Sequence, residues 1–262
     1  MHIVTITDEY IKERIRGGMR NDKRGLMSYR DITIGVGTMP NAEGSAEVNM
    51  GNTKVLAGIK IDLSEPMRDT PGEGNLVTSA ELLPMASDKF DAGPPSPESI
   101  EVARVIDRGI RASGMIDTGS LLIEEGKVWT VYIDIYVLNY DGNLFDAGTL
   151  ASVSALRSAR MPKYENGAVV REGNLQRMKT ANMCTSCTFG KIGSEILLDT
   201  DGSEESFTNA RLTIANDSEY VRAMQKGIGG SFTLAEIDKL MEATFEKSKD
   251  LRSLVTKASG GD

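Results

Sequence analysis

The alternation of apolar and polar residues predicts a run of strands in the first half of the chain. The segments ITIGVG (32–37), SAEVNM (45–50) and TKVLAGIKIDL (53–63) all alternate in the way expected of half-buried strands. Gly51 and Asn52 mark a tight hairpin turn between the second and third segments, because both residue types tolerate positive φ. Residues 75–83 form a fourth expected strand. Residues 128–138, rich in β-branched and aromatic side chains, form the longest one.

Four segments carry the period of an amphipathic or buried helix. Residues 7–17 place Tyr10, Ile11 and Ile15 on one side. A second helix is expected over residues 98–114, with Ser96 as N-cap and Pro97 at the first helical position. The small-residue segment 149–159 predicts a helix that can pack close to a sheet, and the glycines at 227–230 precede a long helix over 233–256.

The second half repeats the rhythm of strands followed by a charged helix. Strands are expected at 183–189, 192–199, 207–215 and 219–225. Strands joined by hairpins, with few helices between them, favour an α+β fold with mixed sheets. The predicted organisation is an N-terminal helix (1–19), a first half (20–162), a linker (163–182), a second half (183–257) and a disordered tail (258–262).

Composition narrows the functional classes. The formal net charge is -8 and the pI is about 5.0, which argues against binding nucleic acid through bulk charge. Any anion site must therefore be local. No apolar run reaches the length of about 18–20 residues that spans a membrane, and the first residues do not read as a signal peptide. We therefore expect a cytoplasmic protein.

Histidine and cysteine usage excludes several chemistries. The single histidine, His2, lies beside the first methionine, so Ser-His-Asp and Cys-His catalysis and multi-histidine metal sites are not expected. Cys184 and Cys187 have no second ligand pair nearby and are interpreted as reduced thiols in a β segment. The acidic stretches 61–69 and 199–206 lack the spacing of a calcium loop and are expected to be solvated. We expect no metal, no cofactor and no catalytic residues.

One helix face stands out against the acidic background. Arg104, Arg108 and Arg111 recur at i, i+4 and i+7, within roughly 60° of each other around the helix. Two interpretations are open. The face could be solvated, with Glu101–Arg104 and Asp107–Arg111 ion pairs. Alternatively, the guanidinium groups could bind phosphates, whose oxygens they match in geometry.

The chain resembles the RNase PH family, and within it the non-catalytic RNase PH-like subunit of the archaeal RNA exosome. The resemblance begins at Arg20-x-Asp22-x-Arg24, followed by Arg30, with Lys23 where the family has glycine. It continues through GSAEVNMGNTKVLAGIKI, NLVTSAELLPMASDKFDAGPP, SIEVARVIDRGIRAS and WTVYIDIYVLNYDGNLFDAGTLASVSAL. Together these motifs cover nearly the whole chain.

Three departures from active family members predict an inactive chain. Active members carry an Arg-Arg pair entering the helix, where this chain has Pro97-Glu98. They hold phosphate with a Gly-Ser/Thr-Arg turn, where this chain has Gly142-Asn143-Leu144. The place of their catalytic aspartate corresponds to Asn209, whose amide cannot serve as a general acid.

The resemblance also implies the ribosomal protein S5 domain 2-like fold, as two pseudo-symmetric halves, and a role in 3′-to-5′ phosphorolytic RNA degradation. Three copies of the chain would alternate with three copies of a catalytic RNase PH-like subunit in a hexameric ring. Cap subunits with S1, KH or zinc-ribbon domains would bind that ring. Single-stranded RNA would contact Arg104 and Arg108, with Arg111 further along the same face.

Two alternatives remain at this stage. The chain could be an active phosphate-dependent 3′-exoribonuclease of the RNase PH type, or a scaffold that makes no RNA contact. The ring hypothesis also predicts that strands near 44–63 and 128–138 leave apolar or edge surface for a partner to cover.

Overall fold

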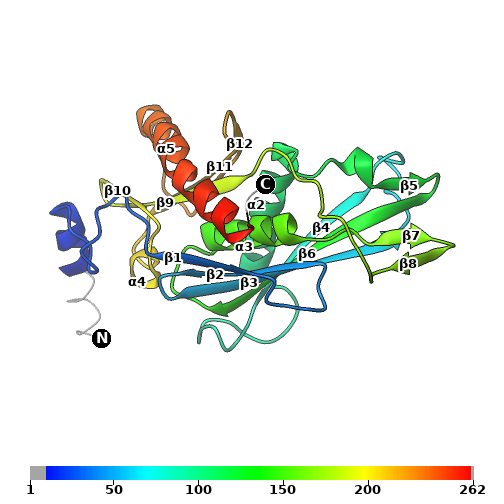
Figure 1. Cartoon of the computed structure of the whole chain (residues 1–262). Helices are drawn as coiled ribbons and strands as arrows, with labels where there is room; N and C mark the ends of the chain where they lie inside the picture. Colours follow the sequence, from blue (N-terminus) through cyan, green and yellow to red (C-terminus); the bar gives the residue numbers. More distant parts are fainter. Residues whose placement is uncertain (1–9, 261–262) are drawn as a thin grey trace.

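A computed structural model describes residues 10–260 of the chain (Figure 1). Residues 10–16 are helical, whereas the start of the predicted helix 7–17 lies outside the described residues, as does His2. Of the tail predicted to be disordered, residues 261 and 262 lie outside. Ser259, by contrast, is buried and donates to the carbonyl oxygen of Val255 at the end of the last helix. Disorder is therefore wrong for the first part of that tail.

The first half of the chain builds a six-stranded mixed sheet in the order β1-β2-β3-β6-β4, with β5 paired to β6. Strand β4 runs parallel to β6, and the other pairs are antiparallel. The bounds are β1 (Ile32–Val36), β2 (Gly44–Met50), β3 (Thr53–Ser64), β4 (Asn75–Leu82), β5 (Leu122–Glu124) and β6 (Lys127–Asn139).

The second half builds a four-stranded antiparallel sheet in the order β10-β9-β11-β12. Its strands are β9 (Thr185–Ile192), β10 (Glu195–Leu198), β11 (Ala210–Asn216) and β12 (Val221–Gly227). The segment predicted as a linker contains a small hairpin of β7 (Lys163–Glu165) and β8 (Ala168–Val170).

Helix α3 (Leu144–Ser158) lies between the two sheets, in contact with β2 and β3 on one side and β9 on the other (Figure 1). Its first thirteen residues, 144–156, are all buried. Small side chains make this close approach possible: a Cβ added to Gly44 on β2 would come within 2.4 Å of the carbonyl oxygen of Ala155. Helix α2 (Pro97–Ser113) packs against β4, α3 and β12, and α5 (Leu234–Ala258) covers β9 and β11. The short elements η1 (Thr118–Leu121) and α4 (Gly202–Glu205) complete the chain.

The α+β class with a mixed sheet is confirmed, and two local expectations need correction. Helix α3 begins at Leu144 rather than 149, because Asn143 adopts a left-handed conformation and caps the helix by accepting from the backbone N–H of Asp146. The strands near 44–63 and 128–138 are not sheet edges: β2, β3 and β6 are interior strands, so the expectation of edge surface there is wrong, whereas that of apolar surface stays a prediction. Among the helices of residues 10–260, none combines the length and apolarity needed to cross a bilayer.

A buried charge network joins the N-terminal segment to both sheets. The carboxylate of Asp199, fully buried, accepts hydrogen bonds from Arg30 at 2.7, 2.8 and 3.0 Å and from Arg24 at 2.8 Å. It also accepts from the side-chain amide of Asn143 at 2.8 Å. Arg20 is equally buried and pairs with Glu204, which is 1% exposed. The acidic stretch 199–206 is thus not a solvated loop, as its sequence suggested, but the partner of the Arg-x-Asp-x-Arg segment.

The surrounding arginines lower the pKa of the Asp199 carboxyl group. Burial would raise the pKa of its carboxyl group, but the hydrogen bonds and charge of Arg30 hold that pKa below the usual value. A lowered folded-state pKa means that the ionised carboxylate stabilises the fold above the unfolded-state pKa. That stabilisation disappears as the pH falls through the folded-state pKa.

We predict that Asp199→Asn lowers the free energy of unfolding by about 3–5 kcal/mol, because it leaves buried guanidinium groups without their carboxylate. Chemical denaturation at pH 7 measures this change. Asp250→Asn, at an exposed position on α5, is the matched control and should change little. The difference in the free energy of unfolding between wild type and Asp199→Asn should narrow as the pH falls below about 4, because the carboxylate is then protonated first in the unfolded chain and at lower pH in the folded one. A gap that stays constant down to pH 2 would contradict this account.

Lys23, which stands where the family that the chain resembles has glycine, gives a second prediction. Lys23 adopts φ of 68°, a left-handed conformation that costs a side-chain-bearing residue roughly 1–2 kcal/mol. Its side chain is exposed. Lys23→Gly should therefore raise the free energy of unfolding by about 0.5–1 kcal/mol after the greater chain entropy of glycine is subtracted. Lys12→Gly in the neighbouring helix should instead destabilise, and an equal effect at both positions would refute the argument.

Candidate functional site

Helix α2 forms where its sequence signals place it. Ser96 is the N-cap and accepts a hydrogen bond from the backbone N–H of Ser99 at 3.1 Å, Pro97 opens the helix, and Gly114 ends it with φ of 65°. One face is buried against the sheet and α3 through Val102, Ala103, Val105, Ile106 and Ile110. The opposite face carries Ile100, Arg104, Arg108 and Arg111, all exposed.

The structure divides the three arginines into two kinds. Arg111 pairs with Asp107 at 3.0 Å, as expected, and donates to the carbonyl oxygen of Leu76 at 2.8 Å. Within residues 10–260, no carboxylate lies within ion-pair distance of Arg104 or Arg108. The Nε of Arg108 makes only a long hydrogen bond, 3.4 Å, to the carbonyl oxygen of Arg104. Two guanidinium groups one turn apart therefore face solvent with their charge unneutralised by any of these residues.

The expected Glu101–Arg104 pair is not formed. Glu101 pairs instead with Arg211 of β11, at 2.5 Å. The guanidinium of Arg211 also lies 4.2 Å from the centre of the Phe145 ring, within the range of a cation–π contact. The helical spacing would pair Glu101 with Arg104, but Glu101 instead pairs with Arg211 of the second sheet. Arg104 therefore has no carboxylate partner among the described residues.

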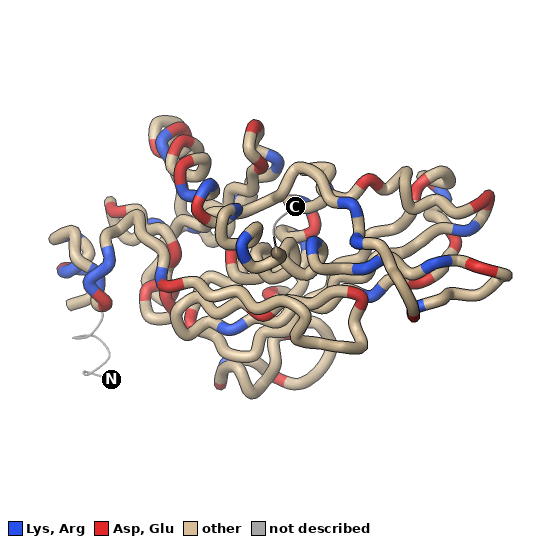
Figure 2. Tube along the Cα trace, viewed as in Figure 1, with Lys and Arg blue, Asp and Glu red and all other residues tan. Residues whose placement is uncertain are grey.

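Positive charge is local rather than general. Figure 2 shows basic and acidic positions interspersed over most of the trace, including along α5. The unpaired arginines of α2 are close to β12: Arg108 lines a small hollow with Val105, Ala223, Met224 and Gln225. We call Arg104 and Arg108 the arginine stripe.

The three departures from active family members have different hydrogen-bond partners. Leu144 is buried, and the backbone N–H of Asn143 donates to Glu205 at 2.7 Å. Asn209 lies elsewhere, with its side-chain oxygen accepting from the backbone N–H of Gly193 at 3.0 Å and its own N–H donating to Lys191. No hydrogen bond among the described residues links Asn209 to the 142–144 turn. The carboxylate beside that turn is Glu205, which the sequence analysis did not single out.

The donors of Asn143, in the middle of the 142–144 turn, are already used by the protein's own carboxylates. Besides the N–H bonded to Glu205, the side-chain amide of Asn143 donates to Asp199 at 2.8 Å and to Asp146 at 3.0 Å. Asp146 is fully buried, and burial raises its pKa to about 6 despite the hydrogen bonds it accepts from Asn143, Ser186 and Thr188. An anion such as phosphate would meet like charge here and could not use the donors of Asn143.

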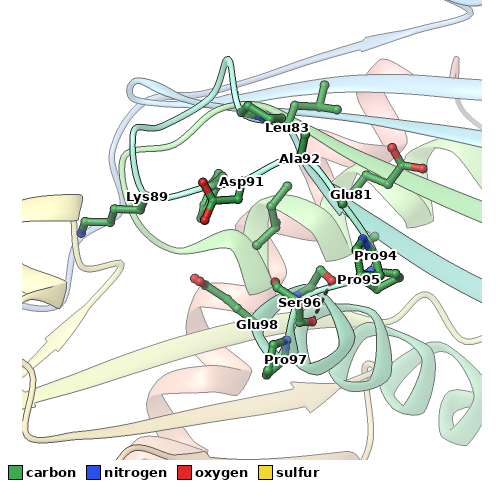
Figure 3. Close-up of a pocket in the computed structure, with 16 residues that line it drawn as sticks. Glu81, Leu83, Lys89, Asp91, Ala92, Pro94, Pro95, Ser96, Pro97 and Glu98 are labelled. Carbon is green, nitrogen blue, oxygen red and sulfur yellow. Dashed lines mark hydrogen bonds between the residues drawn. The ribbon is translucent and has the colours of Figure 1, made fainter.

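The start of α2 carries a carboxylate, Glu98. Burial and the charge of Glu205 raise the pKa of Glu98, while the charges of Arg211 and Lys89 act to lower it. Beside it, a pocket of about 700 Å³ opens between the end of β4 and the start of α2 (Figure 3). Its lining includes Glu81, Asp91 and Glu98 but only one lysine, Lys89, together with three prolines of the 94–97 segment.

The cysteines show no sign of reactivity. Cys184 and Cys187 are free and buried, and burial raises the pKa of each thiol to about 12, so both are protonated at neutral pH. No group of three or more His, Cys, Asp or Glu residues in the described part of the chain is arranged to hold a metal ion.

Comparisons with known proteins agree with this geometry. Residues 28–162 match domain 1 of the 3′ exoribonuclease family, and residues 182–247 match its domain 2. The chain is 41% identical to the exosome complex component Rrp42 of Thermococcus gammatolerans over 261 residues, covering 97% of this chain and 96% of that protein. It is 44% identical to Rrp42 of Thermoplasma volcanium over 249 residues, covering 94% of each.

Solved structures of archaeal exosome chains are also similar to this chain. A chain of the Archaeoglobus fulgidus exosome with RNA bound to the active site superposes with a TM-score of 0.90 at 37% identity, covering 97% of this chain and 99% of that one. A chain of an archaeal exosome core superposes with a TM-score of 0.86 at 36% identity, covering 97% and 98%. With both family domains matched in order on an RNase PH-like α+β fold, the chain belongs to the 3′ exoribonuclease (RNase PH) family.

Proposed function

We propose that this chain is a non-catalytic subunit of an archaeal RNA exosome in the cytoplasm, and that its arginine stripe contacts RNA phosphates. In this proposal three copies alternate with three copies of a catalytic RNase PH-like subunit in a ring, to which RNA-binding cap subunits attach. RNA passes over α2 on its way to the catalytic partner during 3′-to-5′ phosphorolysis. The relatives named Rrp42 and the RNA-bound exosome neighbour support this assignment.

The observation that carries the RNA contact is the unpaired state of Arg104 and Arg108. Most exposed ion pairs contribute little to stability, so leaving a guanidinium unpaired has little cost for folding. It does leave the terminal N–H groups of both guanidiniums free, in a planar arrangement that matches phosphate oxygens. In a chain of net charge -8, two such groups on adjacent turns of one rigid helix form a local anion-binding surface.

The absence of catalysis is inferred from the 142–144 turn and the start of α2. The backbone N–H and side-chain amide of Asn143 are bonded to Glu205, Asp199 and Asp146, and the side chain of Leu144 offers no polar group. Glu98 stands where active members are expected to carry an arginine, and its charge would repel phosphate. These features do not favour the alternative of an independently active exoribonuclease.

We predict that the purified chain alone releases no nucleoside diphosphates from single-stranded RNA and inorganic phosphate. Chromatography of the reaction products measures this release. The catalytic partner should become active, or more active, once the chain is added, because the ring completes its RNA path. Robust release that stays with this chain through repeated purification would overturn the non-catalytic assignment.

Replacing Arg104 or Arg108 by Ala should weaken RNA binding to the assembled complex by about 1–2 kcal/mol each, since the contact is charge-assisted but exposed to water. Each replacement should also flatten the dependence of log affinity on log salt by about 0.7, the contribution of one phosphate on a single strand. The loss should be similar for RNAs of different sequence, because phosphates carry no sequence information. Fluorescence anisotropy of labelled RNA across a salt series tests all three expectations.

Two control variants sharpen the RNA experiment. Arg16→Ala removes an equally exposed arginine from the N-terminal helix and should leave affinity unchanged. Arg111→Ala should have a smaller effect than the stripe variants, because its guanidinium is already bonded to Asp107 and Leu76. If Arg104→Ala and Arg108→Ala keep the wild-type affinity and salt slope, the stripe is a solvated face and the RNA assignment fails.

A further inference from the structure

Arg211 of β11 is held beside α2 by two contacts to the protein itself. Its guanidinium lies 4.2 Å from the centre of the Phe145 ring and pairs with the carboxylate of Glu101 at 2.5 Å. The Arg211 side chain is only 18% exposed, whereas Arg104 and Arg108 are exposed on the outer face of the helix. The charge of Arg211 is therefore used within the fold, and little of this side chain is offered to a ligand.

The neighbouring strand leaves room for Arg211 in this position. Gly227 of β12 lies directly opposite Arg211 in the sheet. A Cβ added to Gly227 would come within 2.4 Å of a terminal guanidinium nitrogen of Arg211, so a larger residue would displace the group. The Nε of Arg211 is buried without a hydrogen-bond partner in the described part of the chain, which is a cost to folding. The contacts to Phe145 and Glu101 thus hold the guanidinium where its own hydrogen bonds are not all made.

Glu101 has two arginines within its possible reach. Glu101 and Arg104 stand at i and i+3 of α2, a spacing at which side chains on one helix meet. An ion pair between two exposed, flexible side chains is weak, because water and lost side-chain entropy offset the attraction. Arg211 is less exposed and is already fixed against an aromatic ring, so it loses less freedom when it binds the carboxylate. Glu101 accordingly pairs with Arg211 across the two elements.

We propose that Arg211 is a positioning residue for RNA binding: it holds Glu101 away from Arg104 and so keeps the Arg104 guanidinium available to an RNA phosphate. Arg211 itself does not contact the RNA. This inference rests on the proposed function and deepens it by assigning a role in RNA binding to a residue outside α2. Without the charge of Arg211, Glu101 pairs with Arg104 and competes with the phosphate for it.

Arg211 also lies among other carboxylates, which gives a competing explanation. Its charge acts to lower the pKa of both Glu98 and Glu205. Loss of Arg211 would make this part of the protein more negative and would weaken RNA binding by general repulsion, with no special part for Glu101. A test must therefore distinguish an effect through Glu101 from repulsion by the whole cluster.

The first experiment removes the charge of Arg211 and keeps an unbranched side chain beside Phe145. Arg211→Met should weaken binding of single-stranded RNA to the assembled complex about two- to fivefold, because RNA must then displace a helical ion pair. The dependence of log affinity on log salt should flatten by up to about 0.7. Fluorescence anisotropy of labelled RNA across a salt series measures both. Arg211→Lys keeps a positive charge beside Glu101 and should lose less affinity; an equal loss in both variants would contradict the charge argument.

The second experiment asks whether removal of one carboxylate reverses the defect. Glu101→Gln added to Arg211→Met should restore the affinity and the salt slope, because an amide does not neutralise Arg104. Glu98→Gln added to Arg211→Met is the matched control. It makes the same change of charge on the same helix but six positions from Arg104, so it should not restore binding. Equal rescue by both changes would show repulsion by the cluster and overturn the proposal.

A double-mutant cycle tests whether Arg211 acts through Arg104. In an Arg104→Ala background, Arg211→Met should lose most of its effect on RNA affinity, because the group that Glu101 would neutralise is gone. In an Arg108→Ala background the effect should persist. An undiminished loss in the Arg104→Ala background would mean that Arg211 contacts RNA itself or supports the complex in general, and the proposal would fail.

A further measurement leaves Arg211 unchanged and so does not depend on how its variants fold. In the full chain labelled with ¹⁵N-arginine, Glu101→Gln should shift the guanidinium resonance of Arg211 and leave that of Arg104 in place. Glu101 is 34% exposed, so this substitution has little cost for folding. A shift at Arg104 without one at Arg211 would show that Glu101 already pairs along the helix, which refutes the inference.

The outcomes separate this inference from the proposed function. If Arg104→Ala and Arg108→Ala keep the wild-type RNA affinity, the stripe does not bind RNA and the role of Arg211 fails with it. If those two variants weaken RNA binding but Arg211→Met does not, or if Glu101→Gln does not reverse its defect, the proposed function stands and the role of Arg211 alone is refuted.

Discussion

The buried carboxylate of Asp199 is the constraint on which the architecture depends. Its oxygens accept from two arginines of the N-terminal segment and from Asn143 at the start of α3. Three stretches that are distant in sequence must therefore come together before any of these charges is satisfied, because a buried ion left unpaired is strongly destabilising. The α3 helix that Asn143 begins lies between the two sheets, so the same network sets the position of one sheet relative to the other.

The same network determines what Asn143, in the 142–144 turn, can offer to an anion. Its backbone N–H and side-chain amide donate to Glu205, Asp199 and Asp146, which are carboxylates of the protein itself. An N–H that stabilises the fold through such a bond is not available to a bound phosphate. The donors of Asn143 therefore hold the start of α3 in place, and the surrounding carboxylates would repel an anion.

Periodicity predicted the elements well because it reflects local physics. The alternation in β3 and β6, the Ser96 cap and the Pro97 start of α2 all appear where the sequence places them, since caps and side-chain alternation are determined within a few residues. Ion pairs between residues far apart in the sequence could not be predicted in the same way. Asp199 and Glu204 looked like a solvated acidic loop, because nothing local shows that Arg20, Arg24 and Arg30 lie against them. The order of strands in the sheet could not be predicted for a similar reason. Pairing of β6 with both β3 and β4 is a tertiary event, so the sequence could not show that strands expected to leave apolar or edge surface lie inside the sheet.

The arginine stripe depends both on the local sequence of α2 and on tertiary contacts to the second sheet. On an isolated helix, Glu101 would neutralise Arg104 about one turn away, and the stripe would lose half its charge. In the folded chain, Arg211 of β11 takes Glu101, while the ring of Phe145 at the start of α3 holds the Arg211 guanidinium in place. Both Arg211 and Phe145 reach α2 only because the two sheets are held together around α3. The free guanidinium of Arg104 is therefore a product of the tertiary fold and not of the helix sequence alone. A chain of the same helical sequence that lacked the second sheet would be expected to present a neutral pair where this protein presents an open positive charge.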